Sequence, residues 1–264
     1  MRRGPYGLPI IGLGSGGPGG LTRAAEKALA EARIVLGYGL YLEEARPFTA
    51  EGATLEPSPM KAEMARAERA LRLAGEGKAV AMVSGGDPGV YAMAGAIFEV
   101  AAAKKLPLGQ GPGQYDIRVI TGTPALTAAA ALLGAPLTHD FCAVSLSDRL
   151  TPWETIERRL DLASRAGFVI ALYNPKSRGR PWQLGRAAEI LLGNLPPQTP
   201  VGLASRMGRK GEAMALTTLG LLAQADVDMQ TTVIVGNEST FVYQGRMITP
   251  RGYAKKYGPK EPAE

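Results

Sequence analysis

Apolar and polar positions form two kinds of segment that alternate along the chain. Short continuous apolar runs, such as 10–13, 34–37 and 79–83, are typical of strands that are buried on both faces of a parallel sheet. Between them, apolar residues recur at helical spacing over 22–33 and 60–74. This regular exchange of strand and helix predicts βαβ units and therefore an α/β fold.

The pattern continues into the second half of the chain with a change of character. Thr151-Pro152-Trp153-Glu154 predicts a helix start, with a Thr cap, Pro at the first position and Glu closing a capping box. The last strands have few helices between them, which favours antiparallel pairs. Further helices are expected at 89–103, 125–134 and from 182, and further strands at 116–120, 142–146, 168–173, 201–205, 213–218 and 231–236. We therefore predict an α/β domain with a parallel sheet at 1–120, an α/β domain with a mixed sheet at 121–250, and a solvated tail at 251–264.

Composition narrows the class of protein. Hydrophobic residues make up 45% and charged residues 20% of the 264 positions, as in ordinary globular proteins. No apolar run is long enough to span a bilayer and no secretory h-region is evident, so we expect a soluble cytoplasmic protein without a membrane partner. The single cysteine, Cys142, excludes an internal disulfide and a cysteine-cluster metal site, and we expect a buried structural thiol and no metal.

The charge balance points to a small acidic ligand rather than to nucleic acid. The net charge is +6, and the basic residues are scattered instead of forming a polybasic tract with interleaved aromatics. We therefore expect no nucleic-acid partner.

The stretch SGGDPGVY at 84–91 follows an apolar strand and precedes a helix. One interpretation is helix punctuation, with Asp87 as N-cap and Pro88 at the first helical position. The other is a ligand site, because glycines at the carboxyl end of a parallel strand let the backbone approach a bound molecule. The glycine-rich run at 12–20 also follows a strand, but it lacks both the acidic partner of a dinucleotide fingerprint and the GK[ST] of a P-loop.

Other strand ends carry turn residues that could line the same edge. They are found at 121–124, 173–177 and 236–240, and each alone is compatible with plain turn chemistry. Standard catalytic constellations are missing: His139 is the single histidine and no G-x-S-x-G elbow accompanies it. This scarcity favours a cofactor that carries the chemistry while the protein positions it.

Several of these segments together resemble the tetrapyrrole methylases. The resemblance covers about residues 8–250 and rests on GLGSGGPGGLT (12–22), SGGDPGVY (84–91), TGTPALTAAAALLGAPL (121–137), ALYNP (171–175) and VIVGNEST (233–240). The segment HDFCAVSLSDRLTPWETIERRL (139–160) is similar to the branch that acts on corrin precursors. The resemblance implies two α/β domains with S-adenosylmethionine in the cleft between them, a homodimer, and methylation of a tetrapyrrole (precorrin) at C17 with contraction of the macrocycle.

The resemblance also implies roles for individual residues. Basic loop residues could bind the substrate carboxylates, and Asp148 and His139 are our candidates for the acid or base of ring contraction. The cofactor-binding residues would be Gly85, Gly86, Asp87, Val90, Tyr91, Pro124, Ala125, Tyr173, Ala204 and Gly236. The substrate-binding residues would be Gly14, Ser15, Gly16, Pro18, Tyr38, Tyr41, Arg149, Lys176 and Arg206.

Two positions depart from the family pattern. Ser15 stands where proline is usual, and Pro124 replaces Ser or Thr, which removes a hydroxyl and an N–H that could bond the cofactor. Three alternatives stay open: an RNA methyltransferase on the same scaffold, a nucleotide-binding module without catalysis, and a methylase of the same pathway that acts on a different carbon.

Overall fold

The computed structural model describes residues 4–59, 61–177 and 179–258. The chain divides into two compact units, Met1–Ala125 (unit 1) and Leu126–Glu264 (unit 2), whereas the sequence placed the domain boundary between 120 and 121. Each unit has its own sheet and its own hydrophobic core.

Unit 1 is built on a five-stranded sheet in the order β3-β2-β4-β1-β5, and every pairing in it is parallel. This confirms the parallel sheet predicted from the apolar runs. The strands are β1 (Tyr6–Gly12), β2 (Ile34–Tyr38), β3 (Thr54–Ser58), β4 (Val80–Ser84) and β5 (Tyr115–Ile120). Because all five run the same way, the loops that follow them share one edge of the sheet, which we call the carboxyl edge of unit 1.

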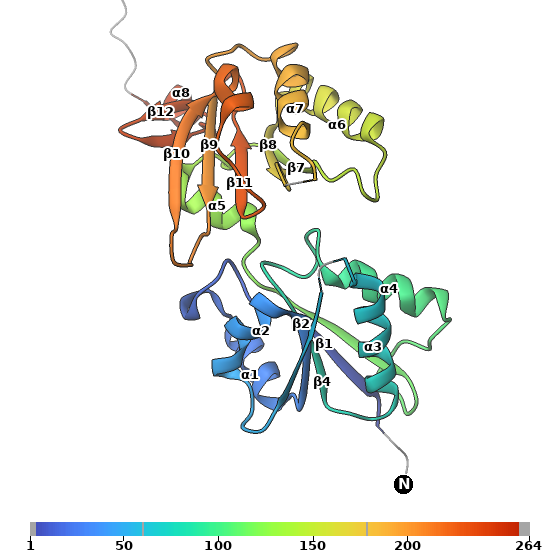
Figure 1. Cartoon of the computed structure of the whole chain (residues 1–264). Helices are drawn as coiled ribbons and strands as arrows, with labels where there is room; N and C mark the ends of the chain where they lie inside the picture. The colour runs from blue at the N-terminus through green and yellow to red at the C-terminus, as the bar shows by residue number, and fades with distance from the viewer. Residues whose placement is uncertain (1–3, 60, 178, 259–264) are drawn as a thin grey trace, which may run out of the picture. The chain divides into compact units, whose positions relative to one another are not determined.

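Helices cover both faces of this sheet, as Figure 1 shows. They are α1 (Arg23–Glu31), α2 (Gly39–Ala45), α3 (Glu63–Gly75) and α4 (Met93–Ala103), with 3₁₀ turns η1 (Pro18–Gly20) and η2 (Arg46–Phe48). Alternate strand residues point to opposite faces: Ile10 and Met82 pack with α3 and α4, whereas Ile11 and Val83 pack with α1 and α2. Burial on both faces explains why these strands are continuous apolar runs.

Unit 2 contains a mixed sheet in the order β10-β9-β11-β8-β7, as predicted. Strands β7 and β8 are parallel, β11 runs antiparallel to both β8 and β9, and β10 runs antiparallel to β9. The strands are β7 (Phe141–Ser145), β8 (Val169–Tyr173), β9 (Pro200–Ser205), β10 (Ala213–Thr218) and β11 (Thr231–Val235). The end of the sheet at which β7, β8 and β9 finish is called here the carboxyl edge of unit 2.

One face of the mixed sheet packs against α6 (Trp153–Arg165), α7 (Gln183–Leu192) and the 3₁₀ helix η3 (Leu219–Gln224). The other face receives α5 (Ala125–Leu133), whose Leu133 side chain lies against the backbone of Gly202. A side chain at Gly202 would stand 2.5 Å from Leu133 Cδ1, so glycine there permits the close approach of helix and strand.

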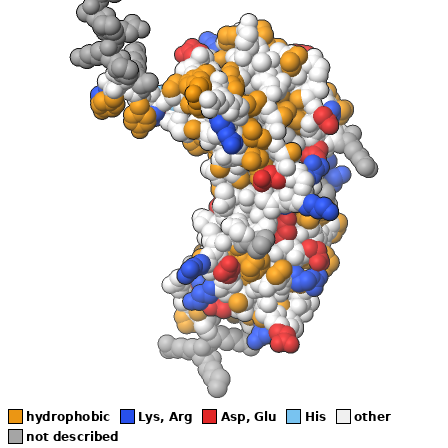
Figure 2. Space-filling model, turned by 90° about the vertical axis from the view of Figure 1, so that its left-hand side faces the viewer, with side chains coloured by type: hydrophobic (Ala, Val, Ile, Leu, Met, Phe, Trp, Pro, Cys, Tyr) orange, Lys and Arg blue, Asp and Glu red, His pale blue; other side chains and the backbone are white. Residues whose placement is uncertain are grey.

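A small three-stranded sheet, β12-β13-β6, completes unit 2. Its elements are β6 (Gly134–Ala135), β12 (Phe241–Tyr243) and β13 (Arg246–Ile248), and α8 (Tyr253–Tyr257) follows. Gln244 and Gly245, both with positive φ (45° and 73°), turn the β12–β13 hairpin. The edge strand β12 exposes all three of its apolar residues, and Figure 2 shows hydrophobic side chains gathered on the surface near this end of the chain.

Several local expectations need correction. The helix expected from Gly89 begins at Met93, with Ala92 as its N-cap, so Asp87 does not cap it. Pro152, not Thr151, is the N-cap of α6, and no side-chain cap bond forms there. Strand β3, helix α2 and the β12–β13 hairpin were not predicted.

The structure bears on two expectations from composition, a membrane-spanning segment and the single cysteine. Among the described residues, no helix combines the length and the apolar character needed to cross a membrane. Cys142 is partly buried against the core of unit 2, and burial raises the pKa of its thiol. A raised pKa keeps the thiol protonated and unreactive, as expected for a structural cysteine.

Candidate functional site

Three loops meet backbone to backbone at the carboxyl edge of unit 1. They follow β1, β4 and β5, and they carry the glycine-rich motifs that the sequence singled out. Gly14 and Gly86 form a two-bond antiparallel bridge, in which Gly86 N donates to Gly14 O at 2.7 Å and Gly14 N donates to Gly86 O at 3.1 Å. The motifs at 12–22 and 84–91 are therefore parts of one assembly.

Glycine is required where these loops touch. A methyl group on Gly122 would overlap the carbonyl oxygen of Gly86 and come within 2.7 Å of Gly14 N. A methyl group on Gly12 would lie 2.6 Å from Gly122 N and 2.7 Å from Gly86 O. Because these neighbours are backbone atoms, they cannot rotate away as a flexible side chain could.

The carboxylate of Asp87 ties two of the loops together. Its Oδ1 accepts a hydrogen bond from Gly89 N at 2.8 Å, and its Oδ2 accepts one from Gly122 N at 3.2 Å. The N-cap interpretation of Asp87 is wrong for this reason: both carboxylate oxygens already serve the loops, and the helix starts later in the chain. The other interpretation of SGGDPGVY, a turn that faces a ligand, stays a prediction.

The backbone at 85–87 is partly exposed at the carboxyl edge of unit 1. The β4 residues are buried, whereas Gly85, Gly86 and Asp87 are partly exposed. Gly86 has φ 65°, and a side chain there would lie 3.8 Å from Pro124 Cα and from Ala125 N. The absent side chain leaves a cradle beside the start of α5, which the methionine part of a cofactor would fit.

The other residues predicted around this cradle lie on the same loop and its surroundings. Val90 is partly buried, and Tyr91 is 55% exposed with φ 52°, a conformation that is rare for an aromatic residue. Tyr41 places its ring 2.6 Å from where a Gly85 Cβ would be, and it packs edge-to-face with Tyr38 at 5.8 Å between centroids. Tyr41 thus lies beside the 84–91 loop with Tyr38 packed against it, and the substrate-binding role that the resemblance implied for both stays a prediction.

The loop after β1 contributes Gly14, Ser15 and Gly16. Gly14 and Gly16 have positive φ (70° and 117°), and the loop folds back so closely that a Gly14 side chain would overlap the Gly20 carbonyl. The backbone of Pro18 begins η1, while its side chain lies outside the described part of the chain. These residues share the carboxyl edge of unit 1 with Gly86.

Sequence reasoning missed Arg66, a buried arginine of α3 at the same edge. It is 6% exposed and donates to Ser58 Oγ, to Pro59 O at 2.9 Å and to Met93 Sδ at 3.3 Å. Burial lowers the pKa of its guanidinium. The available signal was an arginine on the otherwise apolar face of its helix, next to Ala67 and Ala70.

Ser145, Tyr173 and Ala204 share the carboxyl edge of unit 2. Ser145 pairs with Tyr173. Val233 of β11 lies opposite both Leu172 of β8 and Leu203 of β9. Tyr173 and Ala204, the next residues of β8 and β9, are therefore at the same level of the sheet. Tyr173 Oη accepts a hydrogen bond from Leu126 N at 3.0 Å, which satisfies a first-turn N–H of α5. The structure thus brings Tyr173 and Ala204 together, with partly buried Lys176 in the loop that follows β8.

Gly236 does not join them. Strand β11 runs antiparallel to β8, so its carboxyl end lies at the amino end of β8, where Gly236 N donates to Pro200 O at 2.9 Å. Gly236 lies four residue steps beyond Thr232, which pairs with Ala204; this is roughly 14 Å at a rise of about 3.4 Å per residue. The expectation that Gly236 and Tyr173 enclose one adenosine is corrected by this strand direction.

His139 and Asp148 lie at opposite ends of β7. His139 precedes the strand, is 41% exposed at its side chain and accepts a hydrogen bond from Asp140 N at 2.7 Å. Asp148 follows the strand at the carboxyl edge, where its Oδ2 accepts from Gln183 Nε2 at 3.2 Å. The five residues of β7 span roughly 16 Å, so the two side chains cannot act as an acid–base pair.

The basic residues predicted to bind the substrate differ in whether their charge is already paired within the chain. Arg149 is exposed in the loop after β7. Arg206, with φ 52°, donates to Asp228 Oδ2 at 2.7 Å and forms an ion pair with it. The charge of Arg206 is therefore already balanced within unit 2.

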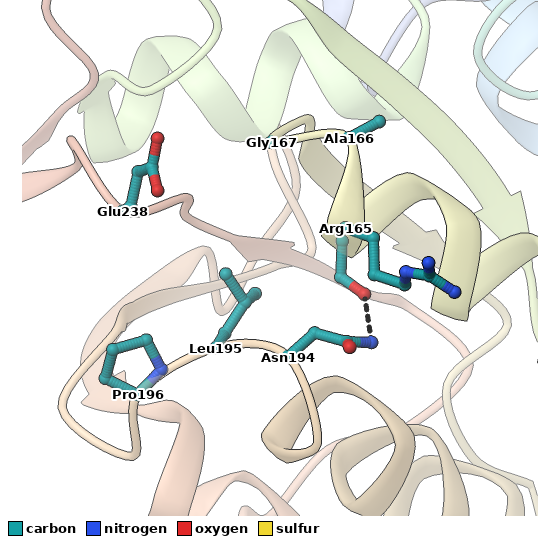
Figure 3. Close-up of a pocket in the computed structure, with 8 residues that line it drawn as sticks. Arg165, Ala166, Gly167, Asn194, Leu195, Pro196 and Glu238 are labelled. Atoms are coloured by element: carbon teal, nitrogen blue, oxygen red, sulfur yellow. Dashed lines mark hydrogen bonds between the residues drawn. The ribbon is translucent and has the colours of Figure 1, made fainter.

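A hollow of about 480 Å³ opens at the other edge of the unit 2 sheet. Figure 3 shows Arg165, Gly167, Asn194, Leu195 and Glu238 around it; Asn194 Nδ2 donates to Ser164 Oγ at 3.0 Å. Gly167 precedes β8 and Glu238 follows β11, so this hollow shares its edge with Gly236. Tyr173, Ala204 and Asp148 lie at the opposite edge of the same sheet, so the hollow is not part of the candidate site.

Comparison with known proteins adds an independent line of argument. Residues 7–223 match the family model described as Tetrapyrrole (Corrin/Porphyrin) Methylases. The chain is 46% identical over 246 residues to a probable cobalt-factor III C(17)-methyltransferase of Salmonella typhimurium, covering 93% of this chain and 99% of that protein. It is 43% identical over 257 residues to a precorrin-3B C(17)-methyltransferase of a Sinorhizobium species, covering 94% and 97%. Its fold matches the crystal structure of the methyltransferase CobJ with a TM-score of 0.83 and 40% identity, over 92% of this chain and 99% of that one.

Proposed function

This chain belongs to the tetrapyrrole (corrin/porphyrin) methylase family, and from this premise we propose that it is an S-adenosylmethionine-dependent methyltransferase of corrin (cobalamin) biosynthesis. Its substrate is precorrin-3B or cobalt-precorrin-3, which it methylates at C17 with contraction of the macrocycle. The support is the near full-length similarity to relatives that are named for C17 methylation of cobalt-factor III and of precorrin-3B.

The observation that carries the proposal is the convergence of three glycine-bearing loops around the partly exposed backbone of 85–87. In unit 1, the cofactor-binding residues are Gly85, Gly86, Asp87, Val90, Tyr91, Pro124 and Ala125. In unit 2, Tyr173 and Ala204 are the residues that the resemblance assigns to adenosine, and they share one sheet edge. Gly236 is left out of the set because of its position at the other edge.

The chemistry requires little from enzyme side chains. When bound, S-adenosylmethionine supplies a methyl group that is already electrophilic because it is attached to a sulfonium. The glycine-bearing loops bind and orient the cofactor through backbone contacts. The Gly14–Gly86 bridge and the Asp87 carboxylate hold these loops in place. Preorganised positioning of this kind is a sufficient source of rate enhancement for such a reaction.

Ring contraction needs a group that accepts or donates a proton. Asp148 is the residue proposed for this role, because it stands at the carboxyl edge of unit 2 next to Tyr173 in the sheet order and is held by Gln183. His139 is not included, since β7 separates it from that edge. An Asp148→Asn variant should retain cofactor binding while losing contraction, which separates the two steps.

The test is an anaerobic incubation with methyl-labelled S-adenosylmethionine and a tri-methylated precursor, supplied in parallel as metal-free and cobalt-loaded forms. We expect the gain of one methyl group by mass spectrometry with one of the two forms and NMR placement at C17. Methylation at another carbon would assign the chain to a different step of the same pathway. Methylation of ribosomal RNA, with retention that falls steeply as salt rises, would replace the proposal by the RNA methyltransferase alternative.

We further propose that the protein works as a cytoplasmic homodimer. The family resemblance motivates this, and the exposed edge strand β12, with Phe241, Val242 and Tyr243 on its surface, is a candidate contact. Light scattering after size exclusion should give twice the 27.7 kDa chain mass. A charged residue at Val242 should shift the protein toward the monomer, and a monomeric wild type would contradict the proposal.

A further inference from the structure

Arg180 is a buried arginine at the carboxyl edge of unit 2. Only 6% of its surface is exposed, although it follows β8 in a polar loop. A tight turn directs it inward: Arg180 N donates to Ser177 O at 2.9 Å, and Ser177 N donates to Arg180 O at 3.2 Å.

The Arg180 guanidinium hydrogen-bonds to backbone carbonyls. Nη1 donates to Leu146 O at 3.1 Å and to Asn174 O at 3.3 Å, which joins the ends of β7 and β8. Within residues 4–59, 61–177 and 179–258, no carboxylate lies within ion-pair distance of Arg180. Burial lowers the pKa of Arg180, and the more distant Asp148 carboxylate opposes this shift.

One edge of the guanidinium lacks an oxygen acceptor. Among the residues that the structure describes, Nε is fully buried without a hydrogen-bond partner, and the hydrogen-bond contact of Nη2 is to the thioether of Met229 at 3.4 Å. Nε–H and one Nη2–H point the same way and form the fork that binds a carboxylate through two parallel hydrogen bonds. In Arg180 the Nη2 end of this fork is covered by sulfur, which is a weak acceptor.

The cover can move. Met229 lies in the turn before β11 and is 42% exposed, and its side chain is unbranched with three rotatable bonds. A stronger acceptor could therefore displace the thioether without a change of the backbone. The carbonyls on Nη1 meanwhile keep the guanidinium plane fixed, so little side-chain freedom is lost on binding.

We propose that the Nε/Nη2 fork of Arg180 binds one peripheral carboxylate of the tetrapyrrole substrate, with the Met229 side chain moving aside. This deepens the proposed function and rests on it, because a corrin precursor carries acetate and propionate side chains. Arg206 does not offer an equivalent fork, since Asp228 already pairs with it. Arg180 therefore acts as a specificity residue for the acidic rim of the substrate.

The first experiment measures binding of two ligands to wild type, Arg180→Lys and Arg180→Met. Uroporphyrin III, an octacarboxylate tetrapyrrole, is followed by its fluorescence, and S-adenosylhomocysteine by calorimetry. We expect uroporphyrin affinity to fall roughly 10- to 100-fold in both variants, because lysine keeps the charge but not the fork. S-Adenosylhomocysteine affinity should stay within about twofold, and Arg165→Lys at the other sheet edge should behave as wild type.

A second variant protects the test against misfolding of the Arg180 variants, which also lose two bonds to backbone carbonyls. Met229→Glu leaves Arg180 in place and offers the fork a carboxylate from within the chain. It should raise the melting temperature and weaken uroporphyrin binding several-fold, whereas Met229→Gln, which has the same length and no charge, should do much less. The octamethyl ester of uroporphyrin III, which has no free carboxylates, should bind Arg180→Met and wild type with the same affinity.

The outcomes separate the inference from the proposed function. If wild type binds neither ligand, the proposed function itself fails. If wild type binds both and folded Arg180 and Met229→Glu variants bind uroporphyrin as tightly as wild type, the inference is overturned and the function stands. If S-adenosylhomocysteine affinity falls instead, the fork binds the carboxylate of the cofactor, and the assignment to the substrate is wrong.

Discussion

Gly122→Ala tests whether close backbone contact builds the site. Gly122 has no unusual φ, so alanine adds no backbone strain, and the effect is steric. The added methyl overlaps Gly86 O and lies 2.7 Å from Gly14 N. Relief requires the loops after β1 and β4 to move apart, and such movement stretches the two Gly14–Gly86 hydrogen bonds.

The magnitude follows from these contacts. Overpacking of a well-packed site costs about 1–3 kcal/mol, and each of the two backbone bonds contributes about 0.5–1.5 kcal/mol. Because the bonds are weakened rather than both lost, we expect the free energy of unfolding to fall by about 2–4 kcal/mol. The displaced 85–87 backbone should also weaken S-adenosylhomocysteine binding by at least about tenfold, since each 1.4 kcal/mol corresponds to a factor of about ten.

Urea unfolding followed by circular dichroism gives the stability, and calorimetry gives the affinity. Gly7→Ala is the matched control, because it changes the same residue types in β1 at a position where a Cβ meets no atom within 4 Å. Gly7→Ala should retain wild-type stability within about 0.5 kcal/mol and wild-type binding. If Gly122→Ala behaves like Gly7→Ala in both measurements, the reasoning about the three loops is refuted.

Three further predictions concern single side chains. Asp87→Ala removes the acceptor of two backbone N–H groups, and S-adenosylhomocysteine affinity by calorimetry should fall about tenfold, with Asp87→Asn in between. Tyr173→Phe removes the bond to Leu126 N, and the free energy of unfolding in urea should fall by about 0.5–1.5 kcal/mol. The hydrogen bonds from Arg69 lower the pKa of Glu56 below the ordinary value of 4.5. The stabilisation that they give is therefore present above pH 4.5 and is lost as pH falls through the pKa of Glu56 in the folded protein. In a plot of the free energy of unfolding against pH, Arg69→Gln should reduce the slope on the acid side.

Each of these has an outcome that contradicts it. Unchanged cofactor affinity in Asp87→Ala would mean that the carboxylate does not hold the loops. A Tyr173→Phe protein as stable as wild type would remove the role given to its hydroxyl. An acid limb that is the same with and without Arg69 would show that Glu56 titrates alike in the folded and unfolded chains.

The sequence predicted the helix–sheet–helix layers of unit 1 well, because strands that are buried on both faces have apolar residues at successive positions. The runs at 10–13 and 79–83 are apolar at successive positions, which is typical of a strand covered by helices on each face. Strand direction is not indicated in this way. Gly236 lies at the carboxyl end of β11 as Tyr173 lies at that of β8, but antiparallel pairing places Gly236 at the other edge.

Predictions from local sequence were wrong where the same side-chain atoms form hydrogen bonds with distant residues. Asp87 has the side chain and the following proline of an N-cap, yet Gly122 N from another loop takes one of its oxygens. Arg180 was among the basic loop residues expected to bind substrate carboxylates, but its burial was not predicted, because the polar sequence around it gives no sign that its side chain points inward. The β12–β13 hairpin could have been found, since Gln244-Gly245 between two apolar segments is a recognisable two-residue turn.

The central claim is that the carboxyl edge of unit 1 binds the methyl donor, and a crystal structure with S-adenosylhomocysteine tests it most directly. The account predicts electron density for the methionine part against the backbone of Gly85, Gly86 and Asp87, next to Pro124. Density in the hollow lined by Gly167, Asn194 and Glu238, with none at 85–87, would contradict it.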